Sequence, residues 1–253
     1  DLDRVLRGET TRLSALRGET IDVPANRLLG VVLAMAVLYG VCMGSFAIFR
    51  PGGPVFLQLA ATAVKVPALF FLTLLVTFPS LYVSNALVGS RLGFSTLFRL
   101  LIASLAVNVA VLASVGPIVA FFSLTTTSYP FMVLLNVVVF AVSGGLGVAF
   151  LLQTLHRLTL VFQVEPPPSN ATPVEAQLVE EPGVLERPDS RAVSRQVKTV
   201  VNCWVVVFAL VGAQMGWVLR PFIGDPNTPF HWVRARGSNF FQAVLHTLIN
   251  LFS

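Results

Sequence analysis

The sequence predicts an all-α fold, a polytopic integral membrane bundle of about five transmembrane helices with an amphipathic helix at each end. Of its 253 residues, 55% are hydrophobic and 11% are charged, whereas soluble domains carry about 25% charged residues. No Asp or Glu lies between Val23 and Val164. A soluble core of this size would need such residues on its outward faces, but a charge at the bilayer centre costs about 2.5–3.5 kcal/mol or more.

The charge distribution favours membrane lipids over nucleic acid as partners. The 17 Lys and Arg residues give a formal net charge of +5, and they lie at the ends of apolar segments instead of on one face. Membrane topology and anionic headgroups explain this placement. Cys42 and Cys203 both fall in apolar segments, where a thiol behaves as a small hydrophobic group, so they carry no information about the redox compartment.

Residues 1–27 are predicted to form a cytoplasmic amphipathic segment. A five-residue repeat, Leu-Arg-Gly-Glu-Thr, occupies residues 6–10 and again residues 16–20. Ten residues are close to three helical turns, so both copies fall on one face of a helix. We expect this helix to lie on the membrane surface; the alternative is a docking peptide for a partner.

Residues 28–162 are predicted to form a block of four transmembrane helices. Each apolar run is long enough to cross about 30 Å of hydrocarbon. We expect the four helices at residues 28–49, 67–88, 97–122 and 130–155.

Prolines interrupt this block. Pro67 biases the residue before it away from helix, so residues 55–64 are predicted to form a separate re-entrant or interfacial helix. Pro79 lies inside the second helix and frees a carbonyl, which Ser80, Ser84 or a neighbouring helix must satisfy. Gly116-Pro117 is expected to break or bend the third helix.

The rest of the chain is predicted in three parts. Residues 163–196 contain three consecutive prolines and most of the remaining acidic residues, which indicates a polar, Pro-rich cytoplasmic linker. Residues 197–224 hold the fifth transmembrane helix, which Arg220-Pro221 ends. Residues 225–253 form an extracytoplasmic turn and an amphipathic C-terminal helix that is too short to span.

Five spans place the termini on opposite sides of the membrane. A cytoplasmic N-terminus puts most Lys and Arg residues inside, as the positive-inside rule requires. The sequence therefore predicts a multi-pass protein of the bacterial cytoplasmic membrane, with the N-terminus inside and the C-terminus outside.

No catalytic, metal or cofactor site is predicted, and the chain is not expected to be an enzyme. His156, His231 and His246 lie at predicted membrane boundaries or in the C-terminal helix, and no His-x3-His, Cys-x2-Cys or Gly-x-Ser-x-Gly pattern accompanies them. Lys65, at the start of the second helix, is the only cation of the four-helix block that we consider a functional candidate, and we interpret it as snorkelling to the interface.

Three groups of residues are candidates for packing, pathway or anchoring roles. Amide side chains in apolar surroundings usually bond across helices, and small residues let helix backbones approach. Aromatic and basic residues at segment ends are typical interface anchors. The interhelical or pathway candidates are Lys65, Asn85, Asn108, Asn136, Gln153, Asn202 and Gln214; the helix-packing face is Ser143, Gly144, Gly145 and Gly147; the anchors are Trp217, Arg220, Trp232, Arg234 and Arg236.

Two stretches carry a resemblance. Residues 65–71 (KVPALFF) with 79–89 (PSLYVSNALVG), and residues 216–224 (GWVLRPFIG) with 236–241 (RGSNFF), resemble a family of uncharacterised bacterial polytopic membrane proteins. Some members of that family are labelled as actin-binding WH2-domain proteins, and their five-span layout is loosely similar to that of Yip1-like proteins. The resemblance implies a five-span fold and brings no activity with it. The segment Leu16–Thr20 departs from a WH2 extension by having Gly at its centre.

We expect a non-catalytic accessory or scaffold subunit of a larger membrane assembly, with other membrane protein subunits as partners. The absence of a charged pathway and the small-residue face favour this function. One alternative is a transporter or channel for a small neutral or lipidic substrate, which would use the breaks at Pro79 and Pro117. A second alternative is a Yip1-like protein that organises the bilayer through its terminal helices.

Overall fold

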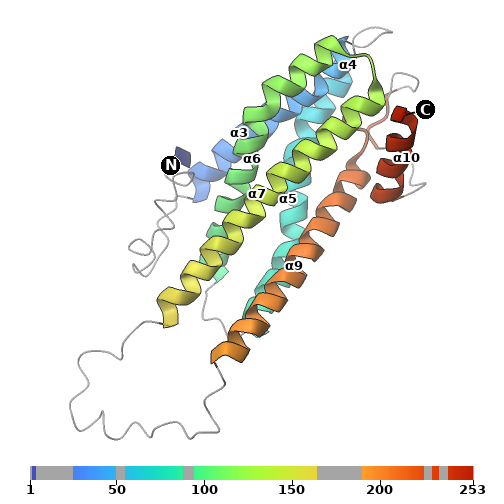
Figure 1. Ribbon diagram of the computed structural model, residues 1–253. Helices are drawn as coiled ribbons and strands as arrows, with labels where there is room; N and C mark the ends of the chain where they lie inside the picture. The colour runs from blue at the N-terminus through green and yellow to red at the C-terminus, as the bar shows by residue number, and fades with distance from the viewer. Residues whose placement is uncertain are drawn as a thin grey trace, which may run out of the picture.

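All the regular secondary structure that the structure describes is helical. The computed structural model describes residues 2–3, 25–49, 55–87, 94–163, 190–224, 230–233 and 239–252. Its helices are α3 (Ala25–Gly44), α4 (Phe46–Phe49), α5 (Phe56–Leu87), α6 (Phe94–Thr125), α7 (Tyr129–Gln163), α9 (Ser190–Leu219) and α10 (Phe240–Phe252) (Figure 1). The N-terminal repeat and most of the predicted linker lie outside the described residues.

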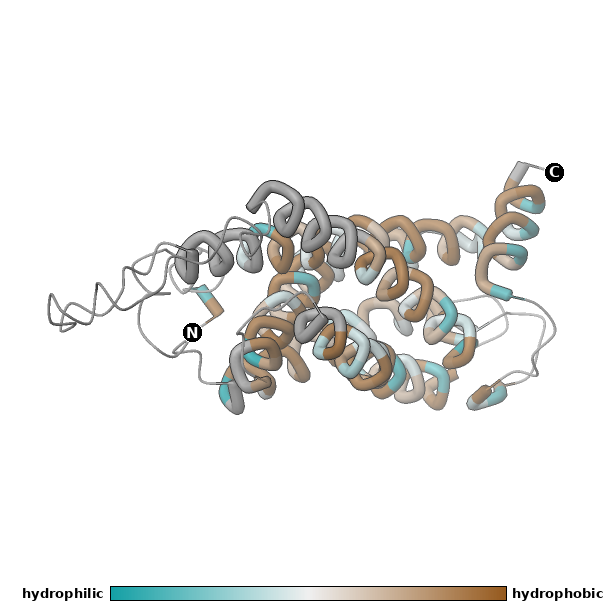
Figure 2. The backbone as a smooth tube through the Cα atoms, turned by 90° about the horizontal axis from the view of Figure 1, so that it is seen from below, coloured by the Kyte–Doolittle hydropathy of each residue, from teal (hydrophilic) through white to brown (hydrophobic). Residues whose placement is uncertain are grey.

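Within the described residues, four stretches are long and apolar enough to cross a membrane. Apolar residues occupy most of the length of these helices, and hydrophilic residues are interspersed among them less often (Figure 2). The all-helical, multi-pass architecture therefore agrees with the sequence prediction at the level of four spans. The four stretches are Arg27–Phe49, Phe56–Val83, Leu97–Thr125 and Tyr129–Thr154.

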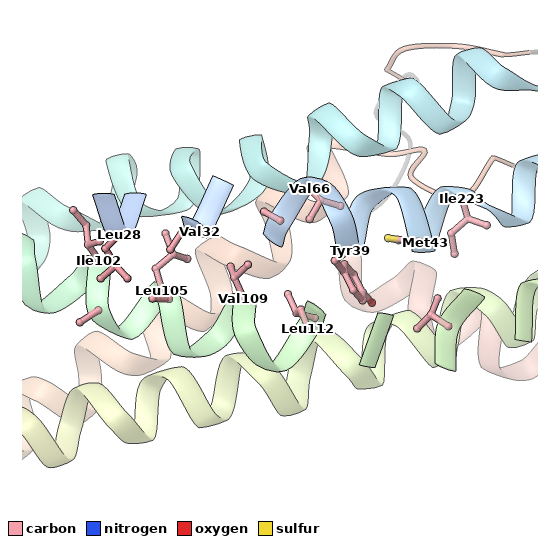
Figure 3. Close-up of a cluster of buried hydrophobic side chains, with 14 of the residues drawn as sticks. Leu28, Val32, Tyr39, Met43, Val66, Ile102, Leu105, Val109, Leu112 and Ile223 are labelled. Atoms are coloured by element: carbon pink, nitrogen blue, oxygen red, sulfur yellow. The ribbon is translucent and has the colours of Figure 1, made fainter. Parts of the chain in front are cut away.

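The helices do not pack in chain order. Neighbouring helices follow the order α7, α6, α3, α5, α9, so that α3 lies between α5 and α6. The short helix α10 contacts α7 and α9 (Figure 1). The main hydrophobic core lies along α3, where Leu28 and Val32 face Ile102 and Leu105 of α6 (Figure 3).

The prediction of a separate helix at residues 55–64 is wrong. Residues Phe56–Leu87 form one continuous helix that includes both Pro67 and Pro79. A proline removes one backbone hydrogen bond, but ending a helix inside an apolar environment leaves several backbone groups unsatisfied, which costs more. For the same reason α6 continues through Pro117 instead of breaking there.

The predicted linker boundary is also wrong at its C-terminal side. Helix α9 begins at Ser190, within the predicted linker of residues 163–196, and ends at Leu219 as expected. The segment that precedes Lys198 is polar, so its sequence lacks the apolar periodicity that signals a helix. The C-terminal helix lies where the sequence predicts it, at Phe240–Phe252.

Candidate functional site

The chain leaves regular helix at a buried position directly after α9. Pro221, Ile223 and Gly224 are buried, and Ile223 belongs to the same core as Met43 and Phe46. In a membrane protein, buried non-helical backbone is tolerated only where protein groups bond to its N–H and C=O groups, because lipid offers no hydrogen bonds. Residues 220–224 therefore form a non-helical segment, largely buried, that needs hydrogen-bond partners from the bundle.

Helix α5 supplies the donors that this segment needs. The Nζ atom of Lys65 donates to the Pro221 carbonyl at 2.9 Å. The Nε2 atom of Gln58 donates to the carbonyls of Pro221 at 3.1 Å and Phe222 at 2.6 Å. The Thr62 hydroxyl shares its one proton between the Phe222 carbonyl and the Gln58 carbonyl of its own helix. We call this set, Gln58, Thr62 and Lys65 with the carbonyls of Pro221 and Phe222, the polar clamp.

The clamp follows from helix geometry. Side chains four and seven residues apart lie on one face of a helix, so Gln58, Thr62 and Lys65 point the same way. Gly224 completes the fit, because its φ of +75° is in the left-handed region. A Cβ at this position would also lie 2.8 Å from Cγ of Gln58. The conformation and the space both require glycine there.

The snorkelling interpretation of Lys65 did not foresee that protein groups would surround its ammonium group. Only 4% of its surface is exposed, and its ammonium group points to the Pro221 carbonyl instead of out of the bundle. The ring of Trp232 lies 5.9 Å from Nζ, within the range of a cation–π contact. A buried ammonium group needs such partners, since desolvation penalises its charge.

The predicted interface anchors divide into two groups. The guanidinium carbon of Arg220 lies 3.3 Å from the centroid of the Trp217 ring, so these two residues stack at the end of α9. Trp232 is exposed and lies beside the clamp. Arg234 and Arg236 lie outside the described residues.

The amide candidates behave differently from one another. Asn136 of α7 follows the prediction: its Oδ1 accepts a hydrogen bond from the Tyr39 hydroxyl of α3 at 2.8 Å, and its Nδ2 donates to the Met132 carbonyl. Asn108 of α6 is buried, but its Oδ1 has no hydrogen-bond partner. Gln153 is exposed and Gln214 is half-buried. Asn85 and Asn202 lie in α5 and α9, and their side chains are outside the described part of the structure.

The small residues that were predicted to form one packing face lie on two different sides of α7. Ser143 and Gly147 are buried, and a Cβ at Gly147 would lie 2.9 Å from Cβ of Asn108 and 3.1 Å from the Ser104 carbonyl oxygen. The Ser104 hydroxyl donates to the Gly147 carbonyl at 2.7 Å. In contrast, nothing lies within 4 Å of a Cβ at Gly144 or Gly145. Only half of the run packs against α6.

Two small-residue pairs were missed, although their sequence signal is present. Gly40 and Gly44 are four residues apart on α3, and a Cβ at Gly40 would lie 2.8 Å from the Thr62 carbonyl oxygen of α5. Gly212 and Gly216 repeat the spacing on α9, where Thr73 and Leu69 of α5 face them. This Gly-x3-Gly pattern is the usual signature of close helix approach in membranes, so a direct search for it would have found both pairs.

A further contact of α9 was not predicted. The indole Nε1 of Trp204 donates to the Ser80 hydroxyl at 3.1 Å and lies 3.4 Å from the Thr77 carbonyl oxygen. Ser80 in turn donates to the same carbonyl at 2.7 Å. This cluster lies beside Pro79, but the carbonyl that it serves is that of Thr77, whereas the carbonyl that Pro79 frees is that of Leu75, four residues before it.

The polar contacts described above mainly join one helix to another, and they do not form an evident reactive site. Within the described ranges, no group of three or more His, Cys, Asp or Glu residues is close enough to hold a metal ion. In the polar clamp, the side-chain donors are already bonded to backbone carbonyls of the chain itself. No family model matches this chain, and neither a curated protein nor a solved structure does.

Proposed function

We propose that the chain is a five-span protein of the bacterial cytoplasmic membrane that acts as a non-catalytic accessory or scaffold subunit of a larger membrane assembly. In this proposal the N-terminus is cytoplasmic and the C-terminus is extracytoplasmic. Three features of the molecule support it: the fifth span, the bonds made by the buried polar groups and the uncovered side of α7.

The contacts between α5 and α9 support the fifth span. The described apolar part of α9, Cys203–Leu219, is shorter than the four other spans. However, α9 contacts α5 at Ser80 through Trp204, and the segment directly after α9 contacts Gln58 of α5 through the Pro221 carbonyl. A helix rises about 1.5 Å per residue, so these levels of α5 are about 33 Å apart. That distance matches the roughly 30 Å thickness of the hydrocarbon core.

The buried polar groups favour a structural role over a substrate path. Tyr39 and Asn136 bond to each other between α3 and α7, and Lys65 is bound to the Pro221 carbonyl. Ser104 bonds to the Gly147 carbonyl between α6 and α7. Groups engaged in this way join helices and would have to release these bonds before they could carry a substrate.

The observation that carries the proposal is the uncovered side of α7. In an 18-residue apolar stretch of α7, 22% of the residues are buried, compared with 39–44% in the corresponding stretches of α3, α5 and α6. The exposed side of α7 combines the small residues Ala141 and Gly145 with the larger Val138, Val142 and Leu146. Small residues four apart allow another helix to approach closely, as Ser143 and Gly147 do on the opposite side of the same helix.

The test is purification of the chain from its native membranes in mild detergent, with and without the substitution Gly145→Leu. A leucine at this site meets nothing in the chain itself, because no atom lies within 4 Å of the Cβ position. We expect wild type to co-purify with a fixed set of membrane subunits and Gly145→Leu to lose them. The matched control is Gly30→Leu on α3, where the Cβ position is equally open. We expect that variant to keep the partners.

A lone monomer or homo-oligomer from wild-type membranes would contradict the proposal, and so would loss of the partners in both variants.

The second candidate, a transporter for a small neutral or lipidic substrate, rests on Asn108. Its buried Oδ1 lacks a partner, which is costly in an apolar environment unless a ligand or water supplies a donor. Flux that Asn108→Leu abolishes in reconstituted vesicles would favour this candidate.

A further inference from the structure

The C-terminal helix α10 has more apolar surface than the bundle covers. It contacts α7 and α9, and its half-buried residues mark the side that faces them. Four large apolar side chains lie elsewhere: Phe241 is 52% exposed, Leu245 is 59% exposed, Leu248 is 42% exposed and Ile249, at the edge of this group, is 56% exposed. The half-buried residues of α10 are Phe240, Ala243, Val244, Thr247 and Leu251.

The remaining side of α10 is polar. Gln242, His246 and Asn250 are exposed, and at 3.6 residues per turn they form one stripe. The amide of Asn250 and the Nδ1 atom of His246 lie 3.1 Å apart, which is a hydrogen bond within the stripe. The same helical spacing places Leu245 and Leu248 beside Phe241. Around the helix axis, a bundle-facing side, an outward apolar stripe and a polar stripe therefore follow one another.

We propose that α10 lies along the boundary between lipid headgroups and acyl chains, with Phe241, Leu245 and Leu248 in the acyl region and the polar stripe in water. A helix with adjacent apolar and polar stripes is stable where an apolar phase meets water, and such helices insert to about 5–10 Å. Exposure of these three side chains to water instead would forfeit the favourable transfer of their apolar surface.

Two observations select lipid as the occupant of the apolar stripe. First, α10 packs against α7 and lies beside the C-terminal end of α9 (Figure 1), where the exposed Val218 is apolar. The stripe thus continues a surface that lipid covers in a spanning bundle. Second, Trp232 is exposed and lies next to the end of α9 that α10 contacts, and tryptophan is typical of the headgroup level.

The experiment measures the surroundings of α10 in the full chain. The protein carries Cys42→Ala and Cys203→Ala, and a nitroxide label is attached at Leu245→Cys or, as the matched control, at the neighbouring His246→Cys. Both sites are exposed and face away from the bundle. After reconstitution into phospholipid nanodiscs, the collision rates of the label with oxygen and with a water-soluble nickel chelate give its depth.

We expect the label at position 245 to collide mainly with oxygen and the label at 246 mainly with nickel. A third label at Leu248→Cys should behave like position 245, which guards against a local effect of one substitution. Nickel-dominated collisions at all three sites would overturn the proposal, because the stripe would then face water. Oxygen-dominated collisions at position 246 would also overturn it, and so would shielding of positions 245 and 248 from both probes, which indicates a protein partner.

Discussion

Two buried carbonyls share three side-chain donors in the polar clamp. Pro221 accepts from Gln58 and Lys65, and Phe222 accepts from Gln58 and Thr62. Each carbonyl therefore keeps one donor after any single change at Thr62 or Lys65. A buried carbonyl that loses its last donor costs about 1–3 kcal/mol, whereas the net contribution of one hydrogen bond is about 0.5–1.5 kcal/mol.

This arrangement predicts a specific pattern of coupling. In Gln58→Leu with Lys65→Met, the Pro221 carbonyl loses both donors, so the double variant should be about 1–3 kcal/mol less stable than the sum of the singles. In Thr62→Val with Lys65→Met, each carbonyl keeps Gln58, so the effects should add. The measurement is the free energy of unfolding in mild detergent. Equal coupling in the two pairs would contradict the described bonding.

The sequence identified Lys65 as exceptional but did not reveal the protein groups that surround it. An isolated lysine in an apolar run suggests snorkelling, because the alternative is a buried charge. The partner that stabilises it, the Pro221 carbonyl, is 156 residues away in the chain and is a backbone atom. Backbone carbonyls leave no trace in a sequence, so the polar clamp could not be predicted from residue types.

At the scale of elements, the small-residue pairs decide how closely helices approach. In Gly40→Ala the new Cβ would lie 2.8 Å from the Thr62 carbonyl oxygen and 2.9 Å from Cα of Ala63, both of them backbone atoms that cannot rotate away. The helices α3 and α5 must separate. We therefore expect a loss of about 1–3 kcal/mol, as for other overpacked cores, and a lower Tm.

The control for this prediction is Gly30→Ala on the same helix. Nothing lies within 4 Å of that Cβ position, so the variant should be unchanged or more stable, since alanine favours helix over glycine by about 1 kcal/mol. Thermal unfolding of the two variants in one detergent makes the comparison. If Gly40→Ala proves as stable as Gly30→Ala, the close packing of α3 on α5 is wrong.

The elements show which sequence rules transfer to this environment. Length and apolar composition identified the helical segments, and the Gly-x3-Gly spacing was available for the interfaces. The rule that proline ends a helix wrongly predicted a helix end before Pro67. That rule comes from soluble proteins, in which water satisfies the backbone groups that a broken helix releases. The Ser143 to Gly147 run illustrates a further limit, since the sequence cannot say which of its two faces meets α6.

At the scale of the whole molecule, the order of helices around the bundle could not be predicted. The chain places α3 first, yet it lies between α5 and α6. Lipid tails are as apolar as leucine, so hydrophobicity does not select one neighbour over another, and the choice depends on the fit of particular side chains. The position of α9 beside α5 depends on Trp204, Gly212 and the clamp, none of which a hydropathy pattern reveals.

The most direct test of the account is the side of the membrane on which the segment between α9 and α10 lies. Single cysteines are placed at Ser14, Thr127 or Thr228 in the Cys42→Ala, Cys203→Ala protein, and an impermeant maleimide is added to sealed vesicles of each orientation. With five spans, Thr228→Cys is labelled from the same side as Thr127→Cys and from the opposite side to Ser14→Cys. Labelling of Thr228→Cys from the Ser14 side would mean that α9 does not cross, and the account would fail.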